Sequence, residues 1–526
     1  MSEQQESRPT QSGGAAPEEF ADSGAQISTA EQRTILLDDA RKHRKHVRAA
    51  HEFAAQWLGK LLYVVGIGWH HWDGKRWAED KGGTRAKAAA METLKAMWGL
   101  ALGDKDLTSD VMACSTASGV RGVLELAGSL EGMCAAAADM DADPYLLNCA
   151  NGTLDLHGLE LRPHDPDDRI TKVTRAAYVP GARSELWEDF LEQVLPDDHV
   201  RSYLARFFGV GLVGKVLEHV FPIATGTGRN GKGVAYTSVL HALGDYGGVA
   251  DPALMEVVKS NPNAPSPAFF DLRGRRMVVL SETDTKIRLS ASVLKRLTGG
   301  DPIKARALRK DPIEFLPSHS FLMVTNHLPE LPSKVADPAV WSRVRAVPFN
   351  VVIPPDEQDP RLPEKLELAA DAILTWMVAG LGEYWERGLD EPEAVQERTS
   401  EYAEGQDDVR RFVAEQCETG GIGDTTTVLH EAYKDWCTAE GIYRRDQLGR
   451  SAFADALARL DYPSVKERRG MVHQGLNVLR EALTVSKEPM VELPPGQRPA
   501  AVPQQSPKPQ TSVWDEVADA PGIMLL

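Results

Sequence analysis

"HVFPIATGTGRNGKGVAYTS", residues 219–238, combines an apolar run with a glycine-rich turn and a lysine. The run from Val220 to Ala224 predicts a short buried strand, and the residues after Lys232 predict a helix. A strand, glycine loop and helix in this order can cradle phosphates. Backbone N–H groups point into the loop, the helix N-terminus attracts anions, and the lysine reaches the β- and γ-phosphates. The predicted phosphate loop consists of Gly226, Thr227, Gly228, Arg229, Asn230, Gly231, Lys232 and Gly233.

Two further apolar runs end in polar residues of the kind that such a site needs. Residues 277–280 are followed by Glu282 and Asp284, and a carboxylate there can polarise an attacking water or hold Mg²⁺. Residues 321–324 are followed by Asn326, whose amide can touch both the γ-phosphate and the water. Each has a plain alternative, since acids are common at strand ends and asparagine before His-Leu-Pro makes a turn.

Arg343 and Arg345 stand just before an apolar strand in "WSRVRAVPF", residues 341–349. An arginine from a neighbouring subunit can neutralise charge on a transferring phosphoryl group, which is worth about 10³–10⁵ in rate. The alternative is a pair of edge arginines that bind the acidic stretch after them. Because loop, strand-end acid, strand-end amide and arginine pair follow one another in order, the joint pattern predicts nucleotide hydrolysis.

A cationic hairpin is predicted between the second and third of these elements. Residues 303–308 alternate apolar and basic side chains, and residues 313–316 return after a turn. In a ring of six subunits the tips would project into a central channel and follow the phosphates of a single strand without reading its sequence. A solvated hairpin is the alternative. The cations concerned are Lys304, Arg306, Arg309 and Lys310.

The composition is that of a soluble globular protein of several domains, with 526 residues, 42% of them hydrophobic and 26% charged. No apolar run approaches a membrane span and no secretion signal is present, so we expect a cytoplasmic protein. The net charge of −17 argues against coating nucleic acid with the whole surface. The five cysteines lack metal-binding spacing and are expected to be free thiols.

The pattern of biased, helical and alternating segments predicts six regions. Tails rich in Ser, Gln and Pro are expected to be disordered, and the patch "RKHRKHVR" at residues 41–48 is interpreted as a solvated helix face. Three helices followed by a small hairpin are in winged-helix order. The regions are a disordered tail (1–30), an α+β N-terminal domain (31–185), the α/β core (186–350), an acidic helical extension (351–405), a winged helix (406–484) and a second disordered tail (485–526).

Taken in order, "GTGRNGKG", "VVLSET", "LTGGDPIKARALRKDPIEF", "FLMVTNHLP" and "WSRVRAVPF" resemble the superfamily 3 helicase core of phage and plasmid primase–helicases, akin to the poxvirus type. The resemblance implies an α/β, AAA+-like motor that forms a ring, expected to be a hexamer, and moves on single-stranded DNA in replication. "NCANGTLDLHGLELRPHDPDD" resembles the domain that precedes the motor, and residues 407–482 resemble its winged-helix end.

By position, the resemblance implies roles for individual residues. Lys232 binds phosphate, Glu282 is the catalytic acid, Asn326 is the sensor and Arg343 is the arginine finger, with Arg345 as second choice. The hairpin cations contact DNA. ATP and Mg²⁺ are the implied cofactors, with Glu282 and Asp284 as metal residues. Single-stranded and forked DNA, further copies of the chain, and a primase or other replication proteins are the implied partners, in a bacterial host cytoplasm.

Two positions depart from that family pattern. Gly233 stands where a Ser or Thr hydroxyl commonly holds Mg²⁺, and Ser281 stands where many AAA+ motors have an Asp. Both departures remove direct ligands, so we expect hydrolysis with weakened Mg²⁺ affinity. No convincing pair of acids such as Asp-x-Asp on a strand precedes the motor, so priming is not expected of this chain.

Other functions are compatible with parts of the pattern. An initiator could use ATP to assemble on an origin and recruit a host helicase without unwinding DNA itself. A DNA packaging motor should carry an acidic nuclease cluster, and the last third of the chain offers none. The predicted winged helix could bind either DNA or protein.

Overall fold

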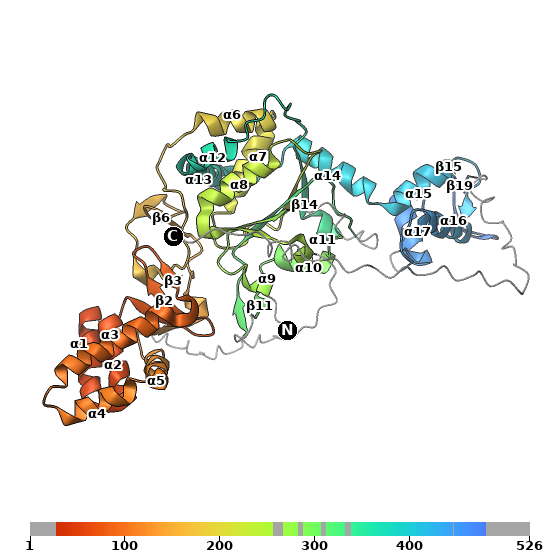
Figure 1. The fold of residues 1–526 in the computed structure, drawn as a ribbon. Coiled ribbons are helices and arrows are strands. Elements are labelled where there is room, and N and C mark those ends of the chain that lie inside the picture. The colour runs from red at the N-terminus through yellow and green to blue at the C-terminus, as the bar shows by residue number, and fades with distance from the viewer. Residues whose placement is uncertain are drawn as a thin grey trace, which may run out of the picture.

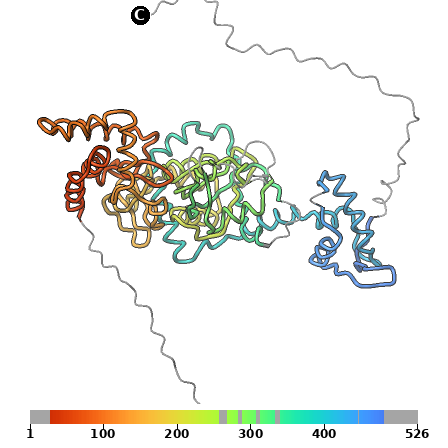
Figure 2. The backbone as a smooth tube through the Cα atoms, turned by 90° about the horizontal axis from the view of Figure 1, so that it is seen from below, coloured from red at the N-terminus to blue at the C-terminus, as the bar shows by residue number. Residues whose placement is uncertain are grey.

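The computed structural model describes residues 28–255, 267–281, 288–306, 312–331, 338–444 and 447–479. Three bodies follow one another along the molecule, as Figure 2 shows from below: the N-terminal helices, the central sheet domain and a separate C-terminal unit. Short 3₁₀ turns lie at Lys81–Gly83, Ala137–Asp139, Pro166–Asp168, Gly244–Tyr246 and Pro252–Met255. Both predicted disordered tails fall almost entirely outside the described residues.

The N-terminal unit consists of five helices beside a four-stranded sheet, with its own hydrophobic core. The helices are α1 (Thr29–Lys42), α2 (Lys45–Trp57), α3 (Thr84–Leu100), α4 (Lys105–Cys114) and α5 (Ala117–Ala127). The sheet has the order β3-β2-β1-β4, with β1 (Leu61–Val64), β2 (Gly68–Trp72), β3 (Trp77–Glu79) and β4 (Cys134–Ala135). The Asp-Gly turn in "GIGWHHWDGKRWAED", residues 66–80, predicts a hairpin, and the antiparallel pairing of β2 with β3 confirms it.

The spacing of apolar residues predicts helix over residues 31–58, and the structure has two helices there. His43 and Arg44 adopt extended backbone angles that end α1 and begin α2. The basic patch at the junction is largely neutralised, since Arg44 binds the buried Asp110 at 2.9 Å and Arg41 binds Asp38. These contacts support the interpretation of the patch as a helix face.

The Asn-Gly and His-Gly turns in residues 148–171 predict a second hairpin. An antiparallel sheet of three strands forms there, with β5 (Leu146–Cys149), β6 (Gly152–Asp155) and β7 (Glu160–Arg162). Leu147, Cys149 and Leu154 pack into the same hydrophobic cluster as the helices of the central domain. This small sheet therefore joins the N-terminal unit to the central domain (Figure 1).

The central domain is built on five parallel strands in the order β14-β8-β13-β10-β9. Their bounds are β8 (Phe221–Thr225), β9 (Gly247–Ala250), β10 (Met277–Ser281), β13 (Ser320–Thr325) and β14 (Val344–Pro348). The apolar runs that predicted three of these strands are buried on both faces, which is typical of parallel sheets.

Successive side chains of these strands point to two different cores. Met277 and Val279 pack among the helices of one face, whereas Val278 and Leu280 pack on the other. The first face carries α6 (Glu185–Val194), α7 (Asp198–Val210), α8 (Lys232–Leu243), α12 (Leu362–Glu367) and α13 (Ala370–Arg387). The second face carries α9 (Pro267–Phe270), α10 (Ala291–Leu297), α11 (Pro338–Trp341) and part of α14 (Glu393–Gly405). The sheet is therefore the middle of three layers (Figure 1).

Helix α13 lies deep in the first of these cores, although it belongs to the acidic stretch of the sequence. Ile373, Leu374, Met377 and Leu381 are fully buried there. Helices α7 and α13 cross closely, because a Cβ atom built at Gly380 would lie 2.1 Å from the carbonyl oxygen of Ala205. The helical segment after residue 350 thus shares one core with the sheet.

The C-terminal unit has a core of its own, and in Figure 1 it stands apart from the sheet at the end of α14. Its helices are α15 (Asp408–Gln416), α16 (Thr426–Ala439) and α17 (Arg450–Arg459). Its strands are β15 (Cys417–Thr419), β16 (Asp424–Thr425), β17 (Ser464–Glu467), β18 (Gly470–His473) and β19 (Leu476–Val478). The three helices precede a hairpin of β17 and β18, as expected, but the short strands β15 and β16 lie between the first and second helices.

Candidate nucleotide-binding site

The glycine loop lies between the end of β8 and the start of α8, as the sequence predicts. Gly226 must lack a side chain, since a Cβ there would lie 2.2 Å from the carbonyl oxygen of Phe349. Gly231 has a φ of 76° and caps the helix, and a Cβ there would lie 2.4 Å from Val194. Close packing and a left-handed backbone therefore explain two of the loop glycines.

Two hydrogen bonds fasten the loop to the chain that follows β14. The side-chain amide of Asn230 donates to the carbonyl of Phe349 at 3.1 Å, and the backbone N–H of Ile353 donates to the carbonyl of Arg229 at 2.8 Å. The first of these contacts is buried. The structural role of Asn230 was missed from the sequence, where the residue was assigned only to the phosphate loop.

Lys232 is the first residue of α8, and only 6% of it is exposed. Its ammonium donates to the carbonyl of Gly226 at 2.8 Å and to the side-chain oxygen of Asn326 at 3.3 Å. Burial lowers the pKa of Lys232 to about 8. No carboxylate is paired with this ammonium among the described residues, so the site holds a buried cation suited to an incoming anion.

The carboxyl ends of the central strands meet at this loop. Thr225 of β8 pairs in register with Thr325 of β13 and with Pro348 of β14, and Ser281 of β10 pairs with Val324. Asn326 therefore lies directly at the phosphate loop, as the strand-end argument predicts. Glu282 and Asp284 follow Ser281 in the sequence but lie outside the described residues.

The two positions that depart from the family pattern are both described. Gly233 lies in the first turn of α8, and a Cβ added to it would meet nothing within 4 Å. Ser281 is held by the helix, because the hydroxyl of Tyr236 donates to its oxygen at 3.3 Å. A serine at position 233 would therefore fit without displacing its neighbours.

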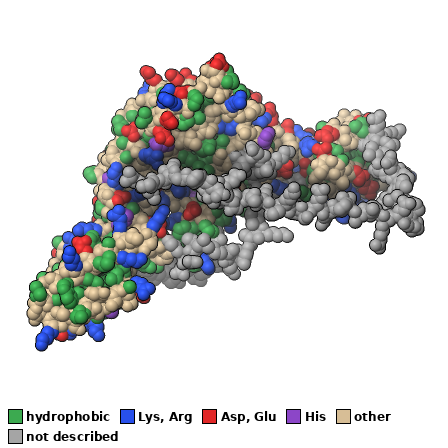
Figure 3. Space-filling model, viewed as in Figure 1, with side chains coloured by type: hydrophobic (Ala, Val, Ile, Leu, Met, Phe, Trp, Pro, Cys, Tyr) green, Lys and Arg blue, Asp and Glu red, His purple; other side chains and the backbone are tan. Residues whose placement is uncertain are grey.

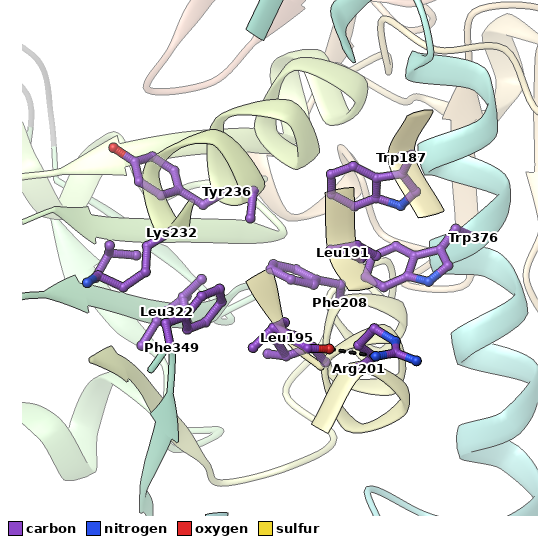
Figure 4. Close-up of a pocket in the computed structure, with 14 residues that line it drawn as sticks. Trp187, Leu191, Leu195, Arg201, Phe208, Lys232, Tyr236, Leu322, Phe349 and Trp376 are labelled. Carbon is purple, nitrogen blue, oxygen red and sulfur yellow. Dashed lines mark hydrogen bonds between the residues drawn. The ribbon is translucent and has the colours of Figure 1, made fainter. Parts of the chain in front are cut away.

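A small apolar cavity of about 20 Å³ lies behind Lys232, between the sheet and helices α6, α7 and α13. Figure 4 shows Phe208 between the lysine and the side chains of Trp187 and Trp376. Arg201 lines the far side and donates to the carbonyl of Leu195 at 2.6 Å. These hydrophobic surroundings keep water from the lysine stem and account for the lowered pKa of its ammonium.

Arg343 lies at the amino-terminal ends of the strands, whereas the phosphate loop lies at their carboxyl ends. It precedes β14, and its backbone carbonyl accepts from the N–H of Phe221 at the start of β8. The length of β8 at about 3.3 Å per residue puts roughly 13 Å between Arg343 and the loop of the same chain. Its Nη1 donates to the carbonyl of Ala339, and its buried Nε has no hydrogen-bond partner among the residues that the structure describes. Arg343 is therefore far from the phosphate loop of its own chain.

Arg345 is occupied within the chain. Its Nε donates to Glu391 at 2.6 Å, and both side chains are largely buried. Its Nη1 also binds backbone carbonyls, including that of Val344 at 2.8 Å. Arg345 therefore binds the acidic stretch that follows it, which is the structural alternative to an arginine finger that the sequence left open.

The cationic hairpin is formed by β11 (Ile303–Ala305) and β12 (Ile313–Phe315). The side chain of Lys304 is 80% exposed and lies 3.3 Å from Glu314 of the facing strand. Arg306 is also exposed. Arg309 and Lys310 at the predicted tip lie outside the described residues, so only the base of the hairpin is confirmed.

Other expectations concern the whole chain. All five cysteines are free, as predicted. Among the described residues, no three His, Cys, Asp or Glu side chains group closely enough to hold a metal ion. No helix in the described ranges combines the length and the apolar character that crossing a membrane requires.

Two family models match the chain. The model described as "D5 N terminal like" matches residues 50–196, and a family of unknown function, DUF5906, matches residues 224–343. The second match begins at the end of β8 and ends at Arg343, so it contains the phosphate loop, Asn326 and the hairpin.

Curated relatives are viral proteins of low identity. "Putative helicase L207/L206" of Acanthamoeba polyphaga mimivirus is 27% identical over 57% of this chain and 33% of its own length. "Putative helicase 022R" of Frog virus 3 is 28% identical over 55% of this chain and 30% of its own length. "Putative primase C962R" of African swine fever virus (strain Badajoz 1971 Vero-adapted) is 23% identical over 57% and 34%. The matched region spans about a third of the length of these relatives.

Solved structures similar to the chain include apo forms of the NrS-1 C-terminal region. One has a TM-score of 0.33 at 13% identity and covers 54% of this chain and 66% of that structure. Another has a TM-score of 0.35 at 11% identity and covers 58% of this chain and 78% of that structure. Scores this low do not define a shared fold.

Proposed function

This chain belongs to the D5-like primase–helicase family, and we propose that it is an ATP-dependent DNA helicase that acts as a ring in genome replication. The observation that carries the proposal is the contact of Lys232 with Asn326 at the carboxyl edge of a parallel sheet. A buried cation beside a strand-end amide is an arrangement suited to phosphate binding and to sensing the γ-phosphate. The AAA+-like identity of the core is part of the same proposal.

ATP phosphates replace the two neutral partners of Lys232 in this scheme. The ammonium is buried and is neutralised by no carboxylate of the described residues, and Gly226 keeps the loop free of a side chain, so both features fit a polyanion. Mg²⁺ would be held by Glu282 and Asp284 behind water molecules and would supply charge neutralisation at the phosphates. Asn326 orients the attacking water, and Glu282 accepts its proton.

Arg343 completes the site of a neighbouring subunit. Its position across the sheet from the loop of its own chain supports action in trans, which requires a head-to-tail assembly. A closed ring of six subunits provides one such seam for each nucleotide. Because Arg345 is paired with Glu391, Arg343 is the better candidate for the finger.

The hairpin converts hydrolysis into movement along DNA. Lys304 and Arg306, with Arg309 and Lys310, contact the phosphates of a single strand in the channel. The C-terminal unit acts as a winged helix that binds duplex origin DNA or a partner protein, and it offers exposed cations for either partner: Arg450, Lys466 and Arg468. We propose that priming comes from a separate protein, because no convincing pair of acids such as Asp-x-Asp on a strand precedes the glycine loop in this sequence.

The genome served is that of a phage or plasmid in a bacterial cytoplasm, as the motif resemblance implies. The viral relatives named above show that related proteins also occur in viruses of eukaryotes. The proposed chemistry is the same in either setting.

ATP-dependent displacement of a labelled strand from a forked duplex tests the proposal. Wild-type protein should displace the strand, whereas Lys304→Ala/Lys310→Ala should retain basal ATP hydrolysis and lose displacement. Lys105→Ala, at an exposed lysine of α4 outside both proposed DNA-binding surfaces, is the control and should behave as wild type. Origin binding without any displacement would instead favour the initiator that recruits a host helicase.

A further inference from the structure

The N-terminal unit has a surface groove between α3 and the α4–α5 turn, with a volume of about 760 Å³. We call it the α3–α5 groove. It is lined by apolar side chains (Met91, Trp98 and Val120) and by cations (Lys87, Lys95 and Arg121). Met91 is 57% exposed and Trp98 is 47% exposed. Methionine and tryptophan are enriched at protein–protein interfaces, so their exposure here is typical of a binding surface. Figure 3 shows hydrophobic side chains gathered on the N-terminal helices beside Lys and Arg.

The charge of the groove has one sign. Three cations line it, and no Asp or Glu of the described residues does. No ion pair links Lys87, Lys95 or Arg121 to an acid in the described part of the chain. An apolar floor with an unneutralised basic rim fits a peptide that is both apolar and acidic.

One segment of the same chain has this composition. Residues 511–526, "TSVWDEVADAPGIMLL", contain three acids (Asp515, Glu516 and Asp519) and no Lys or Arg. They also contain seven large apolar residues, among them Trp514, Ile523 and Leu525. A proline-rich stretch from Pro494 to Pro509 precedes them, and such sequences commonly act as spacers between interacting segments.

We propose that the α3–α5 groove is the docking site for residues 511–526 of this protein. Trp514 and the apolar residues at 523–526 fill the groove beside Trp98 and Met91, and the acidic residues bind the rim cations. Residues 1–27 are also acidic, but their large apolar side chains are far fewer, so they complement the groove less well. The contact links the two ends of the chain, or one subunit to the next, independently of nucleotide hydrolysis.

Fluorescence anisotropy of a dye-labelled peptide of residues 511–526 tests the proposal. The peptide should bind saturably to protein shortened at Gln510 and about tenfold more weakly to the full chain, whose own segment competes from a tethered position. Lys95→Glu/Arg121→Glu in the shortened protein should weaken binding by tenfold or more. Lys105→Glu, an exposed charge reversal on α4 outside the groove, should leave binding unchanged.

A second measurement uses the full chain. Zero-length carbodiimide coupling followed by peptide mass spectrometry should join the Lys87 or Lys95 amine to Asp515, Glu516 or Asp519. Lys232→Ala should give the same crosslinks, which separates this proposal from the proposed ATPase.

Several results would overturn the assignment. These are absence of peptide binding, binding that ignores the charge reversal, tighter binding of a peptide of residues 1–27, or a single-stranded oligonucleotide that occupies the groove and is not displaced by the peptide.

Discussion

The ammonium of Lys232 lies 3.3 Å from the side-chain oxygen of Asn326, although the two residues are 94 positions apart in the sequence. The contact joins the phosphate loop to the end of β13. An anion that enters the loop must compete with Asn326 for this ammonium. Occupancy of the loop is therefore coupled to the position of the Asn326 side chain.

Replacing Asn326 should separate binding from catalysis. Asn326→Ala removes a competitor for the lysine but also the group that orients water, so nucleotide affinity should be kept while kcat falls by about 10²–10³. Lys232→Ala should lose both. Binding of a fluorescent ATP analogue and steady-state hydrolysis measure the two effects. Equal losses of affinity in the two variants would show that Asn326 only supports the loop.

Nucleotide binding should take up a proton in alkaline solution. Burial lowers the pKa of Lys232 to about 8, and bound phosphates raise it again by their negative charge. Affinity should therefore fall as the pH rises through 8. Calorimetry in two buffers of different ionisation enthalpy measures the proton uptake. The guanidinium of Lys232→Arg stays charged in this pH range, so this variant should show no proton uptake.

The same lowered pKa affects the stability of the free protein. Between pH 8 and the ordinary lysine value of 10.5, the unfolded chain binds more protons at this position than the folded chain. The unfavourable contribution of Lys232 to stability therefore diminishes as the pH rises across this window. The thermal midpoint of Lys232→Met should exceed that of wild type at pH 7 by more than at pH 10.

Two glycines of the loop should respond oppositely to alanine. Gly226→Ala forces a Cβ against the backbone of Phe349 and should cost about 1–3 kcal/mol, seen as a lower thermal midpoint. Gly233→Ala is the matched control, since its Cβ meets open space in a helical turn and should be neutral or stabilising by up to about 1 kcal/mol. Similar midpoints for both variants would contradict the packing described for the loop.

A hydroxyl at position 233 should strengthen the use of magnesium. Gly233→Ser fits the open space and supplies a ligand that the wild-type site lacks, so the Mg²⁺ concentration for half-maximal hydrolysis should fall. Titration of ATPase activity with Mg²⁺ measures this, with Gly233→Ala as control. An unchanged requirement would mean that Mg²⁺ is held in another way.

Arg343 and Lys232 should complement each other between subunits. Arg343→Ala and Lys232→Ala should each be inactive alone if every site takes its lysine from one chain and its arginine from the next. Mixed in equal amounts, they should recover about one quarter of wild-type activity, since that fraction of seams keeps both groups. ATPase activity measured at a series of mixing ratios tests whether the two variants complement each other. No recovery under conditions of subunit exchange would place Arg343 outside the site.

Strands β8, β10 and β13 of the core could be predicted because burial on both faces leaves an apolar run in each of them, whereas β9, "GGVA", has no such run. The strand-end rule then brought Asn326 to the phosphate loop correctly, since parallel strands end at one edge. The base of the hairpin also followed from alternation of apolar and basic residues in 303–305.

Long-range contacts could not be read from the pattern. The amide of Asn230 binds Phe349, 119 residues away, and no local signal marks that partner. Helix α13 hides its apolar face within an acidic stretch, so its burial beside α7 was not foreseen. The break between α1 and α2 depends on extended angles at His43 and Arg44, two residues that helices readily accept.

The paired bonds from Asn230 and Arg229 to Phe349 and Ile353 have a mechanical consequence. If the proposed binding of nucleotide shifts the glycine turn, residues 349–353 after β14 must shift with it unless both bonds break. That exit leads directly into α12 and α13. Such a displacement would be transmitted along the backbone from the phosphate loop to the helical layer, without depending on contacts between side chains.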